Sequence, residues 1–212
     1  MTKLSGSTYR HALSERALDD RETAYAYETV KHTPNDFQVE MSYLHFKHET
    51  LAQFQDIRAG IVPLWDDGSH EYKGSNELFH DLDKGVAYVR HTWLSGDNYS
   101  MPNNHPMLES VNRYLPGNSA LLYLNDIFRF VHDVNGHYGG QSEQHFSFGP
   151  TGELNAWKRH RSLYSQTALL ALWCETRGQS AWVNDYDDHR SLPLKDRPFA
   201  PQKAGYVPEV FR

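Results

Sequence analysis

Cysteine is nearly absent from this chain of 212 residues, since Cys174 is the only one. No disulfide can therefore form within the chain, and such thiol usage predicts a cytoplasmic location. Positive charge is also scarce, because 21 Lys and Arg stand against 27 Asp and Glu and give a net charge of −6. This balance disfavours nucleic acid and anionic membrane surfaces as partners.

Long apolar segments are missing as well. The mean hydropathy is −0.72, and no segment approaches the length of apolar chain that crosses a bilayer, so we expect no membrane partner. The segment 1–21 is polar and lacks the apolar core of a secretion signal. Four patterns that mark common enzyme classes are also absent, namely a Walker A loop, a GxGxxG turn, a CxxC pair and a GxSxG elbow.

The length fits a single domain spanning residues 1–212. We expect a loose N-terminal arm at 1–12 and an irregular C-terminal tail at 185–212, where four of the ten prolines lie. Helical periodicity dominates after residue 118, and strand periodicity is confined to two short segments, Phe37–Tyr43 and Gly85–Leu94. The predicted fold is therefore α+β and mainly helical.

Histidine, by contrast, is abundant, with 13 residues, and two of them lie in the segment HDVNGH at 132–137. Apolar residues at helical spacing over 120–134 predict a helix that Ser119 caps. Side chains five residues apart point in different directions on an α-helix. We therefore expect Gly136 to end the helix in a left-handed turn and to return His137 toward His132.

A carboxylate in the second half of the chain completes a metal-binding pattern. A helix is predicted from Leu163 to Arg177, ending before Gly178, and it places Glu175 on an apolar face. A lone carboxylate there is costly unless it is paired, protonated or bound to metal. Two imidazoles and one carboxylate hold a metal on one side and leave the other side open. His132, His137 and Glu175 are thus the predicted ligands, although each alone also fits a structural role.

A further helix, starting near Thr151, places Glu153, Trp157, His160 and Tyr164 on one face. One interpretation is an aromatic packing face with a hydrogen bond between the glutamate and the histidine. The other is that Glu153 and His160 act beside the metal or form a second metal position.

The HDVNGH segment resembles the H-[DE]-x-x-G-H signature of the pterin-dependent aromatic amino acid hydroxylases. In that family both histidines bind a non-haem Fe(II), and a glutamate from a later helix completes the triad. The resemblance implies these roles for His132, His137 and Glu175. Glu153 resembles a further family glutamate between the second histidine and the last ligand. The segment 88–93 is similar to the strand whose arginine grips the substrate carboxylate, which implies Arg90 as a substrate contact.

The resemblance extends from Tyr88 to Trp182, and we assign Trp182 to the substrate together with Arg90. It implies a hydroxylase-like α+β catalytic core, an Fe(II) centre, tetrahydropterin as co-substrate and an amino acid as the small-molecule substrate. The stretch 152–179 also resembles a group of uncharacterised phage and bacterial proteins, which implies no activity.

Three functions follow from these residues. The first is an Fe(II) oxygenase, in which Asp133 orients a ligand and Arg177 or Arg90 contacts an anion. The second is a zinc hydrolase on the same ligands, with Asp133 or Glu153 as general base. The third is a non-enzymatic binding or phage accessory protein, whose polar residues are core pairs. Bound iron, bound zinc or no metal in the purified protein would distinguish the three.

Overall fold

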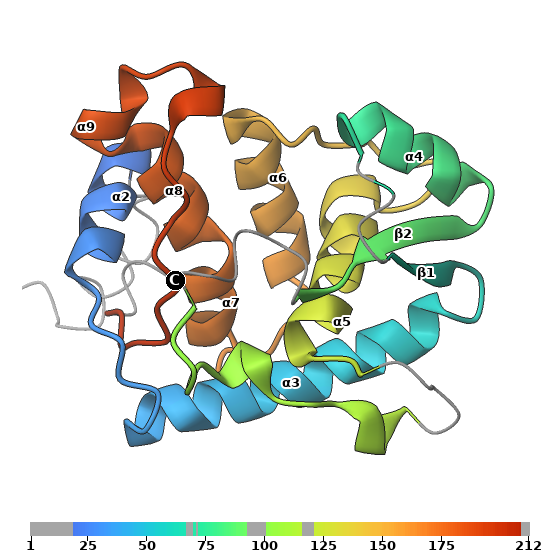
Figure 1. Cartoon of the computed structure of the whole chain (residues 1–212), viewed down its shortest axis with the longest axis horizontal. Helices are drawn as coiled ribbons and strands as arrows, with labels where there is room; N and C mark the ends of the chain where they lie inside the picture. Colours follow the sequence, from blue (N-terminus) through green and yellow to red (C-terminus); the bar gives the residue numbers. More distant parts are fainter. Residues whose placement is uncertain (1–18, 67–69, 71, 93–100, 116–120, 209–212) are drawn as a thin grey trace, which may run out of the picture.

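The computed structural model describes residues 19–66, 70, 72–92, 101–115 and 121–208. They form one mainly helical α+β domain with a two-stranded sheet at one end (Figure 1). The α-helices are α2 (Asp20–Thr29), α3 (Phe37–Ile57), α4 (Ser75–Asp83), α5 (Leu124–Val131), α6 (Pro150–Arg161), α7 (Leu169–Glu175), α8 (Arg177–Asp185) and α9 (Asp187–Arg190). The strands are β1 (Val62–Asp66) and β2 (Val86–Arg90), and the short helices are η3 (Pro106–Leu108), η4 (Asn112–Tyr114), η5 (His132–Tyr138) and η6 (Leu194–Asp196). The arm expected at 1–12, the Ser119 cap and the strand end at Trp93–Leu94 lie outside the described residues.

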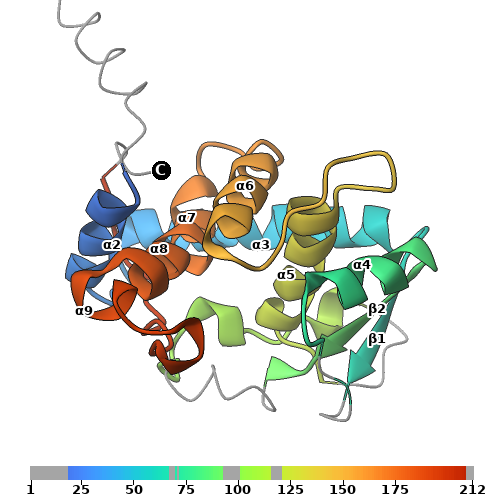
Figure 2. The same ribbon diagram turned by 90° about the horizontal axis from the view of Figure 1, so that it is seen from above.

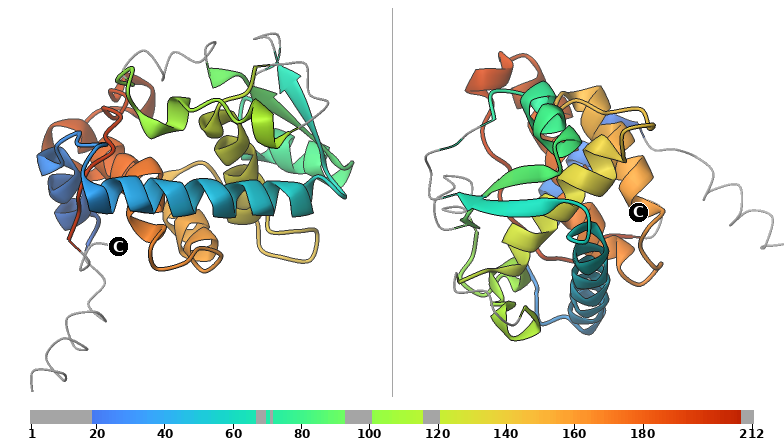
Figure 3. Two further views of the ribbon diagram at one scale, coloured as in Figure 1. Left: turned by 90° about the horizontal axis from the view of Figure 1, so that it is seen from below. Right: turned by 90° about the vertical axis from the view of Figure 1, so that its right-hand side faces the viewer.

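Helix α3 runs across most of the molecule, and other helices pack against it (Figure 3). The strand predicted at Phe37–Tyr43 is wrong, because this segment is the first part of α3. Asp36 caps the helix by accepting hydrogen bonds from the backbone N–H groups of Gln38 and Val39. The apparent alternation arose because Phe37 is 74% exposed and adds nothing to the buried face.

The buried face of α3 follows helical spacing rather than strand spacing. Its members, which all pack into the core, are Val39, Tyr43, Phe46, Thr50 and Phe54. Helices α5 and α7 each pack against α3, and α6 lies between them in the view of Figure 2. The packing fixes the positions of the two helices that carry the histidine segment and Glu175.

The strand predicted at Gly85–Leu94 is confirmed for Val86–Arg90, which is β2. Its parallel partner β1 was not predicted, because Pro63 and the acidic, glycine-containing run after it indicated a loop. Proline is tolerated on an edge strand, and a two-stranded sheet consists of edges. The register pairs Asp66 with Arg90, so the carboxyl ends of both strands meet at one place.

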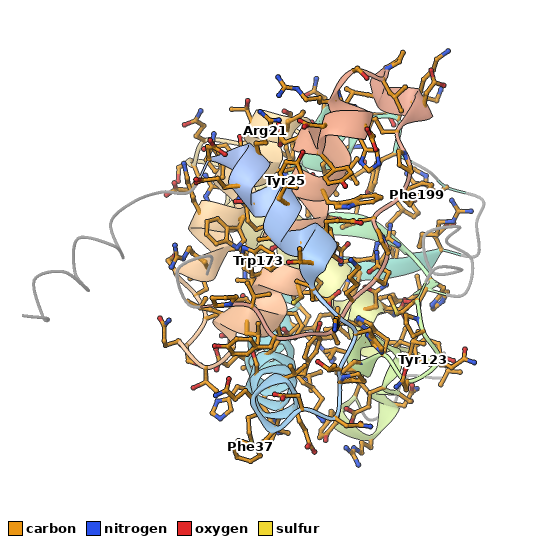
Figure 4. All side chains as sticks on the ribbon, turned by 90° about the vertical axis from the view of Figure 1, so that its left-hand side faces the viewer. Arg21, Tyr25, Phe37, Tyr123, Trp173 and Phe199 are labelled. Atoms are coloured by element: carbon orange, nitrogen blue, oxygen red, sulfur yellow. The ribbon has the colours of Figure 1, made fainter. Side chains whose placement is uncertain are left out.

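The helix predicted from Leu163 to Arg177 is divided into two. Thr176, with φ −134° and ψ −81°, separates α7 from α8. Gly178 lies inside α8 and does not end a helix. A Cβ atom at Gly178 would lie 2.4 Å from Tyr27 Cδ2 and 2.7 Å from Trp173 Cζ3, so glycine permits the close packing of α8 against α2. Figure 4 shows Trp173 beside α2, where it is fully buried.

The described part of the C-terminal segment, 185–208, lies along the body as an extended chain with two short helical segments. It contains α9 and η6, and then continues as extended chain in which Ala200, Ala204 and Val207 are buried. Backbone and hydroxyl hydrogen bonds from Thr33 and Tyr27 tie it to the N-terminal part. None of the helices in the described part of the chain is long and apolar enough to cross a membrane.

Candidate metal centre

His132 and His137 lie on one turn of a π-helix, which follows α5 without a break. A π-helix closes its hydrogen bonds between residues five apart, as Gly139 N does here by donating to Val134 O over 2.6 Å. Residues five apart are therefore brought to the same side. The two imidazole centroids lie 5.0 Å apart, with the rings at 81°.

The left-handed turn predicted at Gly136 is wrong. The left-handed residue is Gly139, with φ 72°, which ends the π-helix. Gly136 has another role, since a Cβ atom there would lie 2.9 Å from His132 Nδ1 and 3.4 Å from Ala156 O. Glycine thus leaves room for the His132 ring and for α6 to approach it.

Helix α6 supplies the third member of the group, Glu153. One donor atom from each of His132, His137 and Glu153 lies within 4.8 Å of the other two. Glu153 Oε2 is 3.9 Å from His132 Nε2, and Glu153 Oε1 is 3.5 Å from His137 Nε2. Both Nε2 atoms thus face one carboxylate, at separations that one shared metal ion can bridge.

Each histidine uses its other ring nitrogen to contact the surrounding protein. His137 Nδ1 lies 2.8 Å from the carbonyl oxygen of Phe146, which can only accept a hydrogen bond. His137 therefore carries its proton on Nδ1 when neutral and leaves Nε2 bare. This is the arrangement that metal-binding histidines commonly have.

His132 reaches the same state through His160. The Gln53 amide oxygen lies 3.2 Å from His160 Nε2 and accepts from Asn135 Nδ2 at 2.8 Å, so His160 carries its proton on Nε2. His160 Nδ1 is then the acceptor for His132 Nδ1, 2.9 Å away. The chain of hydrogen bonds leaves His132 Nε2 bare and directed toward Glu153.

Charge in the group suits a cation. Burial alone would raise the pKa of Glu153, but His132 and His137 outweigh it and lower that pKa to about 2. Burial lowers the pKa of His137, whereas the hydrogen bond and charge of Glu153, aided by Asp133, raise it overall. Burial, followed by the charges of His132 and His137, holds the pKa of His160 well below its usual range, so His160 stays neutral. A metal ion binding to Glu153 meets an ionised carboxylate across the neutral range.

Glu175 does not join this group, contrary to the sequence prediction. It ends α7, and its side chain, only 3% exposed, lies between other partners. Tyr43 donates a hydrogen bond to Oε1, Gln179 donates to Oε2 over 3.4 Å, and His105 Nε2 lies 3.6 Å from Oε1. Burial raises the pKa of Glu175 to about 8, which the bonds from Tyr43 and Gln179 only partly oppose. The Thr176 turn and the packing of α7 on α3 direct Glu175 to Tyr43.

The three metal candidates and Glu175 line one cavity of about 610 Å³. Arg90 at the end of β2, together with Arg129 and Asp133, also lines it. The buried Nε of Arg90 has no hydrogen-bond partner within the described part of the chain. Burial raises the pKa of Asp133, while His137 and His132 oppose that rise. Phe199 and Gln202 of the C-terminal segment contribute to the wall near Glu175 and Gln179, and Figure 4 shows Phe199 on that segment.

Two predicted site residues lie elsewhere. Arg177 forms an ion pair with Asp20 and contacts Thr23 Oγ1 at 3.3 Å. Trp182 donates its indole N–H to Glu28 over 2.6 Å. Neither lines the cavity, and both hold α8 against α2. Their partners therefore explain these side chains without a role in catalysis or substrate binding.

Several residues of the site were not predicted. Gln53, Tyr43 and His105 lie far from the histidine segment in sequence, and only contacts between separate elements bring them in. Gln53 lies on a helix, and a glutamine side chain there does not indicate a metal site from the sequence. The carbonyl oxygen of Phe146 carries no side-chain signal at all.

We predict that His160→Phe weakens Fe(II) binding about 10- to 100-fold. The phenyl ring keeps the stacking on Phe128, but it removes the acceptor that holds the proton on His132 Nδ1. Anaerobic titration calorimetry measures the affinity. His189→Phe is the matched control, because His189 is also buried but packs edge-on against Trp182 and does not line the cavity. Equal affinities for His160→Phe and the wild type would show that this hydrogen bond does not position the ligand.

Comparisons with protein-family models, with curated proteins and with solved structures find no match for this chain. The resemblance to the aromatic amino acid hydroxylases therefore stays a prediction.

Proposed function

We propose that the protein is a mononuclear non-haem Fe(II) oxygenase, with His132, His137 and Glu153 as its metal ligands. The observation that carries the proposal is the convergence of two imidazole Nε2 atoms and one carboxylate beside a cavity. Glu153 thus replaces Glu175 as the third ligand of the site expected from the sequence.

The donor set fits iron of the facial type. Two neutral imidazoles and one carboxylate leave a net positive charge on a divalent ion and leave coordination positions open. When bound, Fe(II) would supply the chemistry of O₂ activation. The chain's own residues fix the ligand orientation, through Phe146 O for His137 and through His160 for His132. We place this reduced iron in the cytoplasm, as the single cysteine also indicates.

The cavity indicates a small anionic substrate. Arg90 and Arg129 line it, and the buried Arg90 Nε still has hydrogen-bonding capacity for a ligand. A guanidinium binds a carboxylate through two parallel hydrogen bonds. The aromatic rings of Tyr72, Tyr88 and Phe128 line the same cavity and offer apolar surface. A carboxylate-bearing small molecule, such as an amino acid, matches this lining, and tetrahydropterin is a candidate co-substrate.

A zinc hydrolase is the second candidate, because the same three ligands suit Zn²⁺. Asp133 supports the hydrolase, because its carboxyl group lines the cavity and burial raises its pKa. With Glu153 as a ligand, Asp133 is the one remaining predicted base.

Oxygen consumption tests the proposal. Apoprotein is loaded with Fe(II) without oxygen, and O₂ uptake is then followed with an amino acid mixture and tetrahydropterin, 2-oxoglutarate or no co-substrate. We expect uptake with one of these mixtures in the wild type and none in Glu153→Gln. Purified protein that retains zinc and hydrolyses esters or amides without consuming O₂ would replace the oxygenase by the hydrolase. A folded protein that binds neither metal would contradict both.

A further inference from the structure

Besides the metal group, the cavity is lined by a second set of polar side chains that contact one another. These are Glu175, Gln179 and Gln202. The two glutamines exchange hydrogen bonds of 3.0 and 3.1 Å, which fix both amides. Phe199, on the same segment as Gln202, adds an apolar ring to this wall.

The two oxygens of Glu175, which lines the cavity, differ in how firmly the protein holds them. Oε1 accepts the Tyr43 hydroxyl proton. His105 accepts the backbone N–H of Met107 at Nδ1 over 3.3 Å, so its proton lies on Nε2, 3.6 Å from the same Oε1. Among the described residues, the hydrogen-bond partner of Oε2 is Gln179, at the long distance of 3.4 Å. The carboxyl group is thus oriented by Oε1 and retains bonding capacity at Oε2.

The described elements that contact Glu175 supply no positive charge to it. Tyr27 from α2 and Tyr43 from α3 are buried hydroxyls whose pKa is raised, so both are neutral. Burial, together with the charge of His32 stacked beside it, lowers the pKa of His105 to about 3, so His105 is also neutral. Gln179 from α8 and Gln202 carry no charge. Among the described residues, no Lys or Arg forms an ion pair with Glu175.

We propose that Glu175 binds the ammonium group of a ligand in this cavity, with Oε2 as the acceptor. A buried carboxyl without a cationic partner is costly as an anion, and a ligand ammonium supplies the missing charge. The arginines on the cavity wall attract anions, so the cavity offers groups of both signs to a ligand that carries both. The inference rests on the same cavity as the proposed oxygenase but not on the metal.

Proton release gives the first test. Glu175 is protonated at pH 7, because burial raises its pKa to about 8. An ammonium group that binds there makes the carboxyl ionise, and the proton leaves to the buffer. Calorimetric titration with benzylammonium, in chelator and in two buffers of different ionisation heat, measures this proton. We expect nearly one proton released per ligand bound at pH 7. At pH 9 Glu175 is already ionised and part of the benzylamine is neutral, so we expect the release to be replaced by proton uptake. Binding without proton release at pH 7 would overturn the proposal.

Matched variants give the second test. Glu175→Gln should weaken benzylammonium binding by about tenfold or more, because the amide lacks the charge. Glu40→Gln, at an exposed carboxylate of α3 that does not line the cavity, should leave it nearly unchanged. Benzyl alcohol, which has the same shape without the charge, should bind the wild type more weakly than the amine does. Equal binding of alcohol and amine, or equal loss in both variants, would contradict the proposal.

The outcome is independent of the oxygenase. Chelator is present throughout, so failure of amine binding leaves the metal measurements untouched, and failure of iron binding leaves the proton count valid. Should Glu175→Gln unfold, the proton release of the wild type still decides the result.

Discussion

Glu153→Gln is expected to lose all stabilisation by Fe(II), while Glu175→Gln keeps it. Metal that binds only the folded state adds about 2.7 kcal/mol to the free energy of unfolding at about 100 times its Kd. The Glu153 amide retains the shape of the side chain but loses the charge that faces His132 Nε2 and His137 Nε2. Thermal unfolding under anaerobic conditions, with Fe(II) and with chelator, measures the effect.

The matched pair of variants makes this result specific. Both change one carboxylate that lines the same cavity, so a general effect of charge on cation binding would appear in both. The opposite result is that Glu175→Gln loses the Fe(II)-dependent shift in unfolding temperature and Glu153→Gln keeps it. It would mean that Glu175 is the third ligand, and it would contradict the proposed site.

The stability of the chain should depend on pH through Glu175. Its pKa rises from 4.5 to about 8 in the folded protein, so the folded state retains a proton that the unfolded chain releases. The stabilisation by the protonated group is complete below pH 4.5 and is lost as pH rises toward 8. Over this interval the free energy of unfolding should fall by about 1.4 kcal/mol for each pH unit from this group.

Urea unfolding of apoprotein at several values between pH 4.5 and 9 measures this slope. Glu175→Gln is the comparison, because its neutral amide keeps the hydrogen bond from Tyr43 and has no proton to retain. The difference in free energy of unfolding, wild type minus variant, should decrease with pH and level off above pH 8. A difference that stays constant with pH would show that Glu175 titrates normally and is in contact with water.

The fold class could be predicted from sequence, and the failures have local causes. Helical periodicity located α5 and α6, and β-branched and aromatic residues located β2. The seven residues Phe37–Tyr43 fit the apolar spacing of a strand as well as that of a helix. The Asp36 cap and the burial of Val39 and Tyr43 on one face show that the segment is helical. Strand β1 was missed because its stability comes from pairing with β2, which a local pattern does not show.

The site could be predicted in part. The two histidines are brought together as expected, but a π-helix and not a turn at Gly136 does so. Apolar spacing predicts α-helices, and it does not reveal the rare π-helix. The choice between Glu153 and Glu175 depends on which helix packs on η5, and that helix is α6. Sequence spacing does not contain this information. Arg90 lines the cavity, since β2 ends there, and its contact with a substrate stays a prediction.

The position of the metal tests the central claim most directly. Crystals grown anaerobically with Fe(II), measured on both sides of the iron absorption edge, would locate the ion by its anomalous scattering. We expect one iron per chain, between His132 Nε2, His137 Nε2 and the Glu153 carboxylate. An iron bound at Glu175 and His105, or none at the histidine pair in iron-replete crystals, would contradict the account.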